Sequence, residues 1–377
     1  MLDSKKVYMI LTNGFDPDIR VYKEAKYLVS RGFDVEILCW DRKCIYKDKE
    51  YEELDGIKIK RFFIPSVPGS GLKQIFPYLK FRKCVRKYLK NKTYTYMHCH
   101  DLDGAIIGIS TRKIKEKKLI FDMHEFYETE RHKKINFIIR ALVKKCQNRA
   151  FKIIHVNDKQ LEKMSDENKK KLIFLPNYPE KSELSQVMHI DSNILRITYA
   201  GYIRHLVPMQ NLIKAANELQ NIAVYIHGVG ECYNTIKDME KNYKNVYVGE
   251  KFEHRELIDF YSNCDIIYCV YNNDNSNDNT ALPTKLFESV ICKIPIIVSN
   301  NSAMYEFVKK YDIGFGVNGS DYNDIKKLLN NINIDRSILN KKISNLEKIS
   351  NNFIWETVVK NLDDIYGDKD EYNNVVK

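Results

Sequence analysis

Short apolar runs alternate with amphipathic stretches along most of the chain. Residues 6–12 have the continuous apolar pattern of a buried strand, and residues 18–31 then repeat apolar positions at the spacing of one helix face. Another buried-strand pattern follows at residues 35–39. Because strands that alternate with helices build parallel sheets covered by those helices, this order predicts a doubly wound α/β domain.

The alternation continues through both halves of the chain, with one break. In the first half, further strands are predicted at 57–64, 94–98, 118–122 and 151–156, and helices begin near 72, 103 and 134. The polar segment 177–192 is typical of a linker. In the second half, strands are predicted at 195–200, 222–226, 246–248, 265–270, 294–298 and 315–317, and helices at 209–219, 233–242, 255–262 and from Pro283 onward.

Two successive sheets of this kind predict two Rossmann-like domains. We expect residues 1–180 to form the first domain and residues 181–352 the second, while residues 353–377 form a helix that packs back on the first domain, and a tail. Such sheets bind ligands beyond the carboxyl ends of their strands, so we expect the chemistry in a cleft between the domains.

The composition is that of a folded protein without a membrane span. The chain has 377 residues, of which 44% are hydrophobic, and this length suits two domains better than one core. No apolar run approaches the roughly 20 residues that cross a bilayer, and residues 1–6 lack a signal peptide's apolar segment. We therefore expect a cytoplasmic protein. The nine cysteines include no C-x-x-C pair, which favours buried reduced thiols over disulfides or zinc ligands.

The net charge of +11 is concentrated in the first half of the chain. Residues 1–185 contain 40 basic and 25 acidic residues, a net +15, whereas residues 186–377 contain 21 and 25, a net −4. Leu72–Lys92 carries eight Lys or Arg and no acid, interleaved with aromatic and aliphatic side chains. Such a helix can bind an anionic membrane surface, and a solvated helix face is the alternative. Without a recognised nucleic-acid-binding module, we expect no nucleic-acid partner.

A very polar run at residues 272–280 precedes the helix that begins at Pro283. A polar loop followed by a proline opens a helix N-terminus to solvent, where free backbone N–H groups favour an anion such as phosphate. On this helix Thr284, Lys285 and Glu288 share one face. An ordinary amphipathic helix with a solvated Lys285–Glu288 pair is the alternative.

The turn after the first strand contains Gly14 but no G-x-G-x-x-G pattern. The absence of this pattern argues against a dinucleotide-dependent dehydrogenase, because the turn lacks the glycines that let a pyrophosphate approach the first helix. The Gly14 backbone can still meet a phosphate, and a glycine needed only for the geometry of the turn is the alternative.

Histidines and acids follow two further strands of the first half. His124 stands between Asp122 and Glu125 at a strand end, where polar side chains line the cleft of this architecture, so it is a site candidate. His98 and His100 lie on one strand and point the same way, as two zinc ligands would. The sequence offers no fourth ligand at a recognisable spacing, so we predict no metal site.

In the second half, Arg204 follows a strand and a small turn. An arginine at this place could reach a diphosphate with a forked, charge-assisted contact. Another strand leads into Gly228 and Gly230, which is weak evidence for a phosphate-binding turn when taken alone.

Taken together, these residues resemble family 4 of the retaining, nucleotide-sugar-dependent glycosyltransferases, which have the GT-B fold. The likeness covers nearly the whole chain, and its order and spacing make it more specific than any one motif. The matching stretches are Asp16-Pro17-Asp18-Ile19-Arg20-Val21 with Glu24-Ala25, Asp122-Met123-His124-Glu125, Tyr199-Ala200-Gly201-Tyr202-Ile203-Arg204, the glycine turn at 228–230, Tyr247-Val248-Gly249, and Pro283-Thr284-Lys285-Leu286-Phe287-Glu288.

The resemblance implies a role for each matching residue. Arg204 would contact the diphosphate of the donor, Glu288 would accept hydrogen bonds from the ribose hydroxyls, and His124 would face the donor sugar. Lys251 and Phe252 are weaker candidates for the nucleobase loop. The backbone at the start of the helix would hold the sugar and the distal phosphate, through Ala281, Leu282, Pro283 and Thr284.

The implied donor is a UDP- or GDP-sugar, used as a substrate without a separate cofactor or metal. Arg204 and Lys285 would stabilise the charge that develops on the leaving diphosphate. Two positions depart from the family's pattern. The acid that often stands eight residues before Glu288 is Thr280 here, so Asp274 or Asp278 would have to replace it. The Lys-Gly that often follows the arginine is also missing from residues 207–211, which leaves Lys285 as the second cation.

The function implied is the transfer of a sugar to an acceptor hydroxyl with retention, in the assembly of bacterial or archaeal surface polysaccharide or glycolipid. The acceptor would be a glycan or a lipid-linked molecule, and residues 72–92 would place the enzyme on the inner face of the membrane. A nucleotide-sugar 2-epimerase or hydrolase of the same fold is one alternative. A catalytically silent partner subunit that binds a nucleotide sugar is another.

Overall fold

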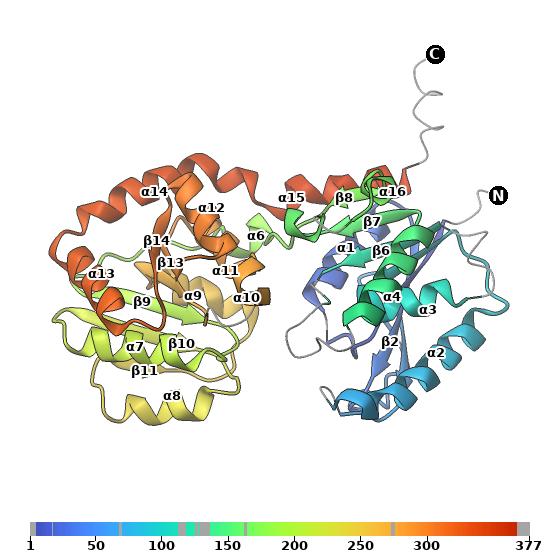
Figure 1. Cartoon of the computed structure of the whole chain (residues 1–377), viewed down its shortest axis with the longest axis horizontal. Coiled ribbons are helices and arrows are strands. Elements are labelled where there is room, and N and C mark those ends of the chain that lie inside the picture. Colours follow the sequence, from blue (N-terminus) through green and yellow to red (C-terminus); the bar gives the residue numbers. More distant parts are fainter. Residues whose placement is uncertain are drawn as a thin grey trace, which may run out of the picture. The chain divides into compact units, whose positions relative to one another are not determined.

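The computed structural model describes residues 5–16, 18–67, 70–111, 118–124, 127, 136–161, 164–272 and 276–367. Pro17, Glu125 and Asp274 therefore lie outside the described residues. The chain divides into two compact units, Met1–Pro176 with Val359–Lys377, and Asn177–Val358. Each unit is built on its own sheet, with helices packed against it (Figure 1). These two sheets confirm the predicted α/β class.

The sheet of the first unit has eight strands, and all of them are parallel to their neighbours except the edge strand β3. Their order across the sheet is β3 (Tyr51–Leu54), β4 (Ile57–Phe63), β2 (Asp34–Asp41), β1 (Lys6–Leu11), β5 (Tyr96–His100), β6 (Lys118–Met123), β7 (Lys152–His155) and β8 (Leu172–Phe174). In the register of β5 and β6, His100 lies opposite Asp122. This pairing brings together two motifs that are far apart in the sequence.

In the described part of the chain before the second unit, this sheet is accompanied by the helices α1 (Ile19–Ser30), α2 (Ile75–Leu89), α3 (Asp101–Ile109), α4 (Asn136–Arg149) and α5 (Asp166–Lys169). The side chain of Asp18 caps α1, accepting a hydrogen bond from the backbone N–H of Val21 at 3.3 Å. This cap fixes the start of the helix that carries Arg20 and Glu24, both buried.

The first unit is completed by residues that follow the second unit in the sequence. These are the 3₁₀-helix η7 (Val359–Leu362) and α16 (Asp363–Tyr366), which follow α15 (Trp355–Val358) of the second unit without a break. Leu362, Ile365 and Tyr366 are buried, as the spacing of one helix face requires. The Asn361 side chain donates a hydrogen bond to the Phe174 carbonyl at 2.8 Å, which ties this segment to β8.

The second unit has a fully parallel six-stranded sheet. Its order is β11 (Val246–Val248), β10 (Ile222–His227), β9 (Leu195–Ala200), β12 (Ile266–Cys269), β13 (Ile296–Ser299) and β14 (Gly314–Val317). The helices are α6 (Lys181–Leu184), α7 (Leu206–Asn217), α8 (Tyr233–Glu240), α9 (Leu257–Ser262), α10 (Ser276–Thr280), α11 (Thr284–Cys292), α12 (Ala303–Tyr311), α13 (Tyr322–Ile334) and α14 (Ser337–Ile349), besides α15. The predicted linker therefore contains α6, and the predicted polar loop contains α10.

Two general expectations can be compared with this fold. None of the helices in the described part of the chain combines the length and the hydropathy that a membrane span requires. All nine cysteines are free thiols, but the prediction that they are buried holds for only five of them: Cys39, Cys99, Cys146, Cys264 and Cys269.

The turns that follow β9 and β10 pack directly against each other. Gly201 and Gly228 have φ values of 141° and 137°, which side chains rarely allow. A β-carbon on Gly228 would lie 1.9 Å from the carbonyl oxygen of Gly201. Only glycine fits this contact, so the two strand ends are held at backbone distance.

We expect Gly228→Ala to lower the urea midpoint of the protein strongly. The free energy of unfolding should fall by at least about 2 kcal/mol, because the backbone strain of a positive φ adds to the overlap of the new β-carbon with Gly201. Gly32→Ala is the matched control, since Gly32 also has a positive φ (79°) but a β-carbon there would meet nothing within 4 Å. The control should cost about 1 kcal/mol. Equal losses in the two variants would contradict the close packing of the strand ends.

Candidate functional site

The N-terminus of α11 lies beside the strand ends of the second unit. Pro283 has an extended backbone (ψ 160°) and precedes the helix, so the prediction that it is the first helical residue was wrong by one position. Among the described residues no side chain caps this helix. Ala281, Leu282, Pro283 and Thr284 are half-buried. The arrangement suits the anion site that the sequence predicts here.

Lys285, in the first turn of α11, reaches back to the end of β9. Its Nζ lies 4.8 Å from the centre of the Tyr199 ring, and a β-carbon on Gly201 would come within 2.6 Å of it. Burial acts to lower the pKa of Lys285, but nearby acidic groups, Tyr199 first, outweigh it and raise this pKa overall. The ammonium is therefore charged at neutral pH and rests against a turn made of bare backbone.

Glu288 lies one turn further along α11 and is only 6% exposed. Its Oε2 accepts a hydrogen bond from the Tyr261 hydroxyl at 2.5 Å. Burial, followed by the charge of Glu288, raises the pKa of Tyr261 well above its usual value, so the hydroxyl keeps its proton. The alternative of a solvated Lys285–Glu288 pair is therefore wrong, because Glu288 is a buried carboxylate held by one donor.

Arg204 follows the same β9 turn, and its side chain is exposed. Its Nε donates to Nε2 of His205 at 3.2 Å, and its guanidinium carbon lies 5.8 Å from the centre of the Tyr271 ring. His205 stacks on Tyr271 with ring centres 4.4 Å apart. Burial, with help from the charges of Arg204 and Lys285, lowers the pKa of His205 to about 4. A neutral histidine thus stands beside two cations.

His205 and Tyr271 did not emerge from the sequence as site residues. His205 had one available signal, its position directly after Arg204, but a single histidine carries no pattern. Asp278, on α10, lies with Oδ2 4.0 Å from Nδ1 of His205. Of the two acids predicted to replace the one missing at Thr280, Asp278 is the one that can be described, and it lies close to the arginine turn.

Lys251 and Phe252 follow β11. Lys251 is exposed, whereas Phe252 packs edge-on against Phe260, with ring centres 5.3 Å apart. Phe260 in turn stacks on His227 at the end of β10, with ring centres 3.7 Å apart. Phe252 is therefore part of an aromatic group at one side of the strand ends, which is a suitable wall for a planar base.

In the first unit, Gly14 follows β1, and its carbonyl accepts a hydrogen bond from Nε of Arg61 at 3.1 Å. The residue with a left-handed backbone in this turn is Phe15, with φ 53°. A β-carbon on Gly14 would make only ordinary contacts, the nearest at 3.6 Å to Asp41. The alternative that Gly14 is needed for the turn geometry is therefore wrong.

His124 follows β6 and is held by Asp122. Nε2 of His124 lies 2.5 Å from Oδ2 of Asp122, and the other ring nitrogen lies 3.9 Å from Oδ2 of Asp101. Burial raises the pKa of Asp122, but Arg20 and His124 outweigh it and hold this pKa well below its usual range. Burial lowers the pKa of His124, yet Asp122 outweighs it and raises the value to about 9. At neutral pH the pair is ionic.

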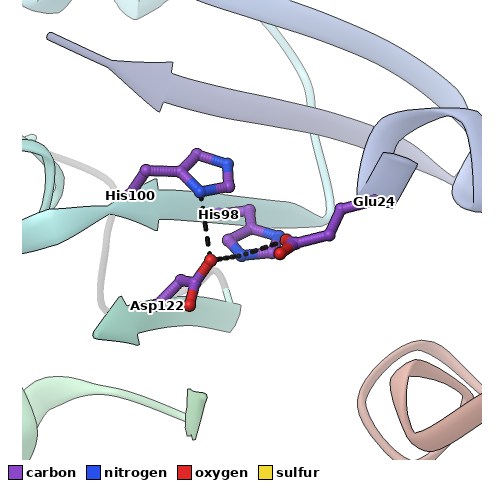
Figure 2. A group of neighbouring side chains, drawn as sticks. All are labelled: Glu24, His98, His100 and Asp122. Atoms are coloured by element: carbon purple, nitrogen blue, oxygen red, sulfur yellow. Dashed lines mark hydrogen bonds and ion pairs between the residues drawn. The ribbon is translucent and has the colours of Figure 1, made fainter. Parts of the chain in front are cut away.

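Asp122 belongs to a buried group that the sequence did not predict. Figure 2 shows Glu24, His98, His100 and Asp122 converging from α1, β5 and β6. Nδ1 of His100 lies 3.1 Å from Oδ2 of Asp122, and the rings of His98 and His100 stack 4.5 Å apart, on the same side of their strand as predicted. Glu24 was missed as a member because it stands on α1, far from the others in the sequence.

Two family profiles match the chain. "Glycosyltransferase Family 4" covers residues 19–177, and "Glycosyl transferases group 1" covers residues 180–349. No curated protein sequence matches the chain significantly.

Among solved structures, sucrose-phosphate synthase from Thermosynechococcus elongatus is 15% identical with a TM-score of 0.74, over 98% of this chain and 100% of that one. HepE from Anabaena, in complex with UDP and glucose, is 12% identical with a TM-score of 0.69, over 96% and 99%. WaaG, a glycosyltransferase involved in lipopolysaccharide biosynthesis, is 11% identical with a TM-score of 0.64, over 96% and 100%. At identities this low, the structural likeness shows a shared fold alone.

The matched profiles cover the two units in turn, and the fold agrees with them. The chain therefore belongs to family 4 of the glycosyltransferases, the retaining enzymes of GT-B fold that use nucleotide-sugar donors.

Proposed function

We propose that this enzyme holds the diphosphate of a UDP- or GDP-sugar between Arg204, Lys285 and the N-terminus of α11. The observation that carries the proposal is the placement of the Lys285 ammonium against the Gly201 turn, which leads into Arg204. Two cations beside the same neutral His205 repel each other. A bound diphosphate would relieve this repulsion and neutralise both.

The same arrangement suits the bond that breaks. Cleavage of the sugar–phosphate bond leaves negative charge on the nucleoside diphosphate, and preorganised cations with backbone N–H groups stabilise it. Glu288, oriented by Tyr261, would accept hydrogen bonds from the ribose. Asp278 would take over the contact to a sugar hydroxyl, and His124 would face the sugar. The leaving phosphate would take the proton of the acceptor hydroxyl.

UDP is the first donor nucleotide to test. HepE, which shares the fold, has been solved with UDP and glucose. The aromatic group formed by His227, Phe252 and Phe260 offers a flat apolar surface, and Lys251 next to it offers a donor for the carbonyl groups of a base.

For the acceptor, we propose a glycan or lipid-linked molecule at an anionic membrane, in surface polysaccharide or glycolipid assembly. α2 buries Phe81, Val85 and Leu89 against the sheet, yet Phe76 is 81% exposed and Leu72, just before the helix, 80%. Large apolar side chains on a basic, solvent-facing surface are typical of helices that lie on anionic bilayers. WaaG, which acts in lipopolysaccharide biosynthesis, shares the fold.

Donor binding can be tested by thermal shift with UDP-, GDP-, ADP- and CMP-sugars. We expect stabilisation by UDP-glucose or a related UDP- or GDP-sugar, and at least a tenfold weaker affinity in Glu288→Gln, which keeps the volume but loses half of the acceptor capacity. Lys214→Gln, an exposed change on α7, is the control. Undiminished binding in Glu288→Gln would refute the placement of the donor. Formation of an epimer or free sugar, with or without acceptor, would favour the epimerase or hydrolase instead.

Membrane binding can be tested by cosedimentation with liposomes that contain phosphatidylglycerol. Each lysine near an anionic surface contributes about 1 kcal/mol, so the double variant Lys80→Gln/Lys83→Gln should bind about 30-fold more weakly. Lys327→Gln, on α13 of the second unit, should bind as the unchanged protein does. If the unchanged protein stays in the supernatant, the proposed membrane surface is wrong.

The ionic state of His124 can be tested by NMR of histidine side chains, assigned with His124→Gln. The midpoint should lie near pH 9 and fall by about two units or more in Asp122→Asn, because removal of the carboxylate favours the neutral ring. The folded pKa exceeds the unfolded value of about 6.5, so His124 stabilises the fold below pH 6.5 and this contribution is lost as the pH rises through 9. The midpoint of His205, in the second unit, should be the same in both proteins. An unchanged His124 midpoint would contradict the ion pair.

A further inference from the structure

The side chains that surround the Asp122 carboxylate lie in the interior of the first unit. Glu24 and His98 are fully buried, and His100 is almost so. Nε2 of His98 lies 3.4 Å from Oε2 of Glu24 and 3.7 Å from Oδ2 of Asp122. These contacts, drawn in Figure 2, connect the carboxylate that holds His124 with a histidine on the neighbouring strand.

This group has the ligand types and the spacing of a metal site, because one atom from each residue lies within 4.8 Å of the others. A cation is already present, however. The buried guanidinium of Arg20 contacts Oδ1 of Asp122 at 3.0 Å and Oε1 of Glu24 at 3.1 Å, and it also donates to the Leu175 carbonyl at 2.9 Å. Arginine stays charged, so a divalent ion here would meet a fixed positive neighbour. The geometry favours a support for Asp122 instead.

The C-terminal segment of the chain enters this group through Tyr366. Its hydroxyl lies 2.9 Å from Nδ1 of His98. Burial raises the pKa of Tyr366 well above its usual value, so the hydroxyl stays protonated. Burial also lowers the pKa of His98, so the ring carries a single proton. Whether this proton lies on Nδ1 or Nε2 decides whether His98 attracts or repels the Asp122 carboxylate.

The protonation states of Glu24 and Asp122 determine which ring nitrogen of His98 carries the proton. Burial, then Asp122, raises the pKa of Glu24 to about 8, so Glu24 is protonated at neutral pH and Asp122 is the ionised partner. Nε2 of His98 lies 3.7 Å from that anion, which is beyond hydrogen-bond distance, but the negative charge still favours a proton on Nε2 over one on Nδ1. Nδ1 is then an acceptor, which is the state that a donating Tyr366 hydroxyl stabilises.

We propose that Tyr366 is a positioning residue of the transferase: its hydroxyl fixes His98, and His98 with Arg20 and His100 holds the Asp122 carboxylate against His124. This inference rests on the proposed role of His124 at the donor sugar. Without the hydroxyl, His98 can place its proton on Nδ1, and the lone pair of Nε2 then repels Asp122. The charged and titratable groups that act on His124 are Asp122, Arg20, Asp101, His100, Glu24 and His98.

The experiment compares Tyr366→Phe with Tyr96→Phe in the full chain. The two rings pack against each other with centres 4.7 Å apart, but the Tyr96 hydroxyl contacts Lys118 at 3.5 Å. Each variant keeps its ring and loses one hydroxyl. Circular dichroism and thermal melting check that both are folded.

In Tyr366→Phe we expect the ¹⁵N shifts of His98 to show a mixture of tautomers and the midpoint of His124 to fall by about one pH unit. With UDP-glucose as the donor probe, kcat should fall about tenfold while KM for the donor stays unchanged, as loss of one buried hydrogen bond behind the site predicts. Tyr96→Phe should resemble the unchanged protein in all of these measurements.

Unchanged His98 and His124 spectra in Tyr366→Phe would overturn the inference, and so would equal changes in Tyr96→Phe, which would indicate loss of packing alone. One zinc per chain by elemental analysis, removable by a chelator with loss of the His98 signal, would also overturn it. If the unchanged protein does not turn over UDP-glucose, the proposed donor fails, while the histidine spectra still decide the role of Tyr366.

Discussion

The ion pair between Arg20 and Asp122 is the contact on which the first unit's site depends. It joins α1 to the end of β6, and the same guanidinium reaches the carbonyl that follows β8. A buried pair of this kind adds little net stability, but removal of one partner leaves a bare charge and typically costs about 3–5 kcal/mol. The pair therefore fixes geometry: it keeps one carboxylate ionised inside the sheet, and that carboxylate keeps His124 protonated.

The basic side chains at the two candidate sites have different surroundings. In the first, Arg20 is surrounded by carboxyl groups and a carbonyl, so its charge is already balanced. In the second, Arg204 and Lys285 lie beside the rings of Tyr199, His205 and Tyr271, and the charges of Asp278 and Glu288 also act on them. One unit thus uses a cation to hold its own side chains in place, and in the other the two cations are the ones that we propose for the diphosphate.

The sequence predicted the architecture well because periodicity and strand-end chemistry are local. β9 and β11 have the predicted bounds, and the helix that carries Lys285 and Glu288 was off by one residue, since Pro283 stays extended. The edge strand β3 was missed because it is only four residues long and its side chains are mostly exposed. A pattern of apolar residues carries little information about such a strand.

The parts of the site that could not be predicted are contacts between residues that are far apart in the sequence. Nothing near Glu24 or Tyr366 in the sequence indicates that both reach His98, since they come from α1 and α16. Likewise, the contact between Gly201 and Lys285 joins a strand turn to a helix far along the chain. Residue types and spacing predicted an anion site at α11 and a role for His124, and both stay predictions, whereas the protonation of His124 follows only from packing.

The first unit is interrupted in the sequence by the whole of the second. During synthesis on the ribosome, β1 to β8 can assemble as soon as residue 176 has emerged, but the surface that Leu362, Ile365 and Tyr366 cover stays open until the whole second unit has been made. The histidine centre is therefore completed only after the second unit has been synthesised. A chain that ends within the second unit can hold all eight strands of the first sheet, yet it lacks the hydroxyl that contacts His98.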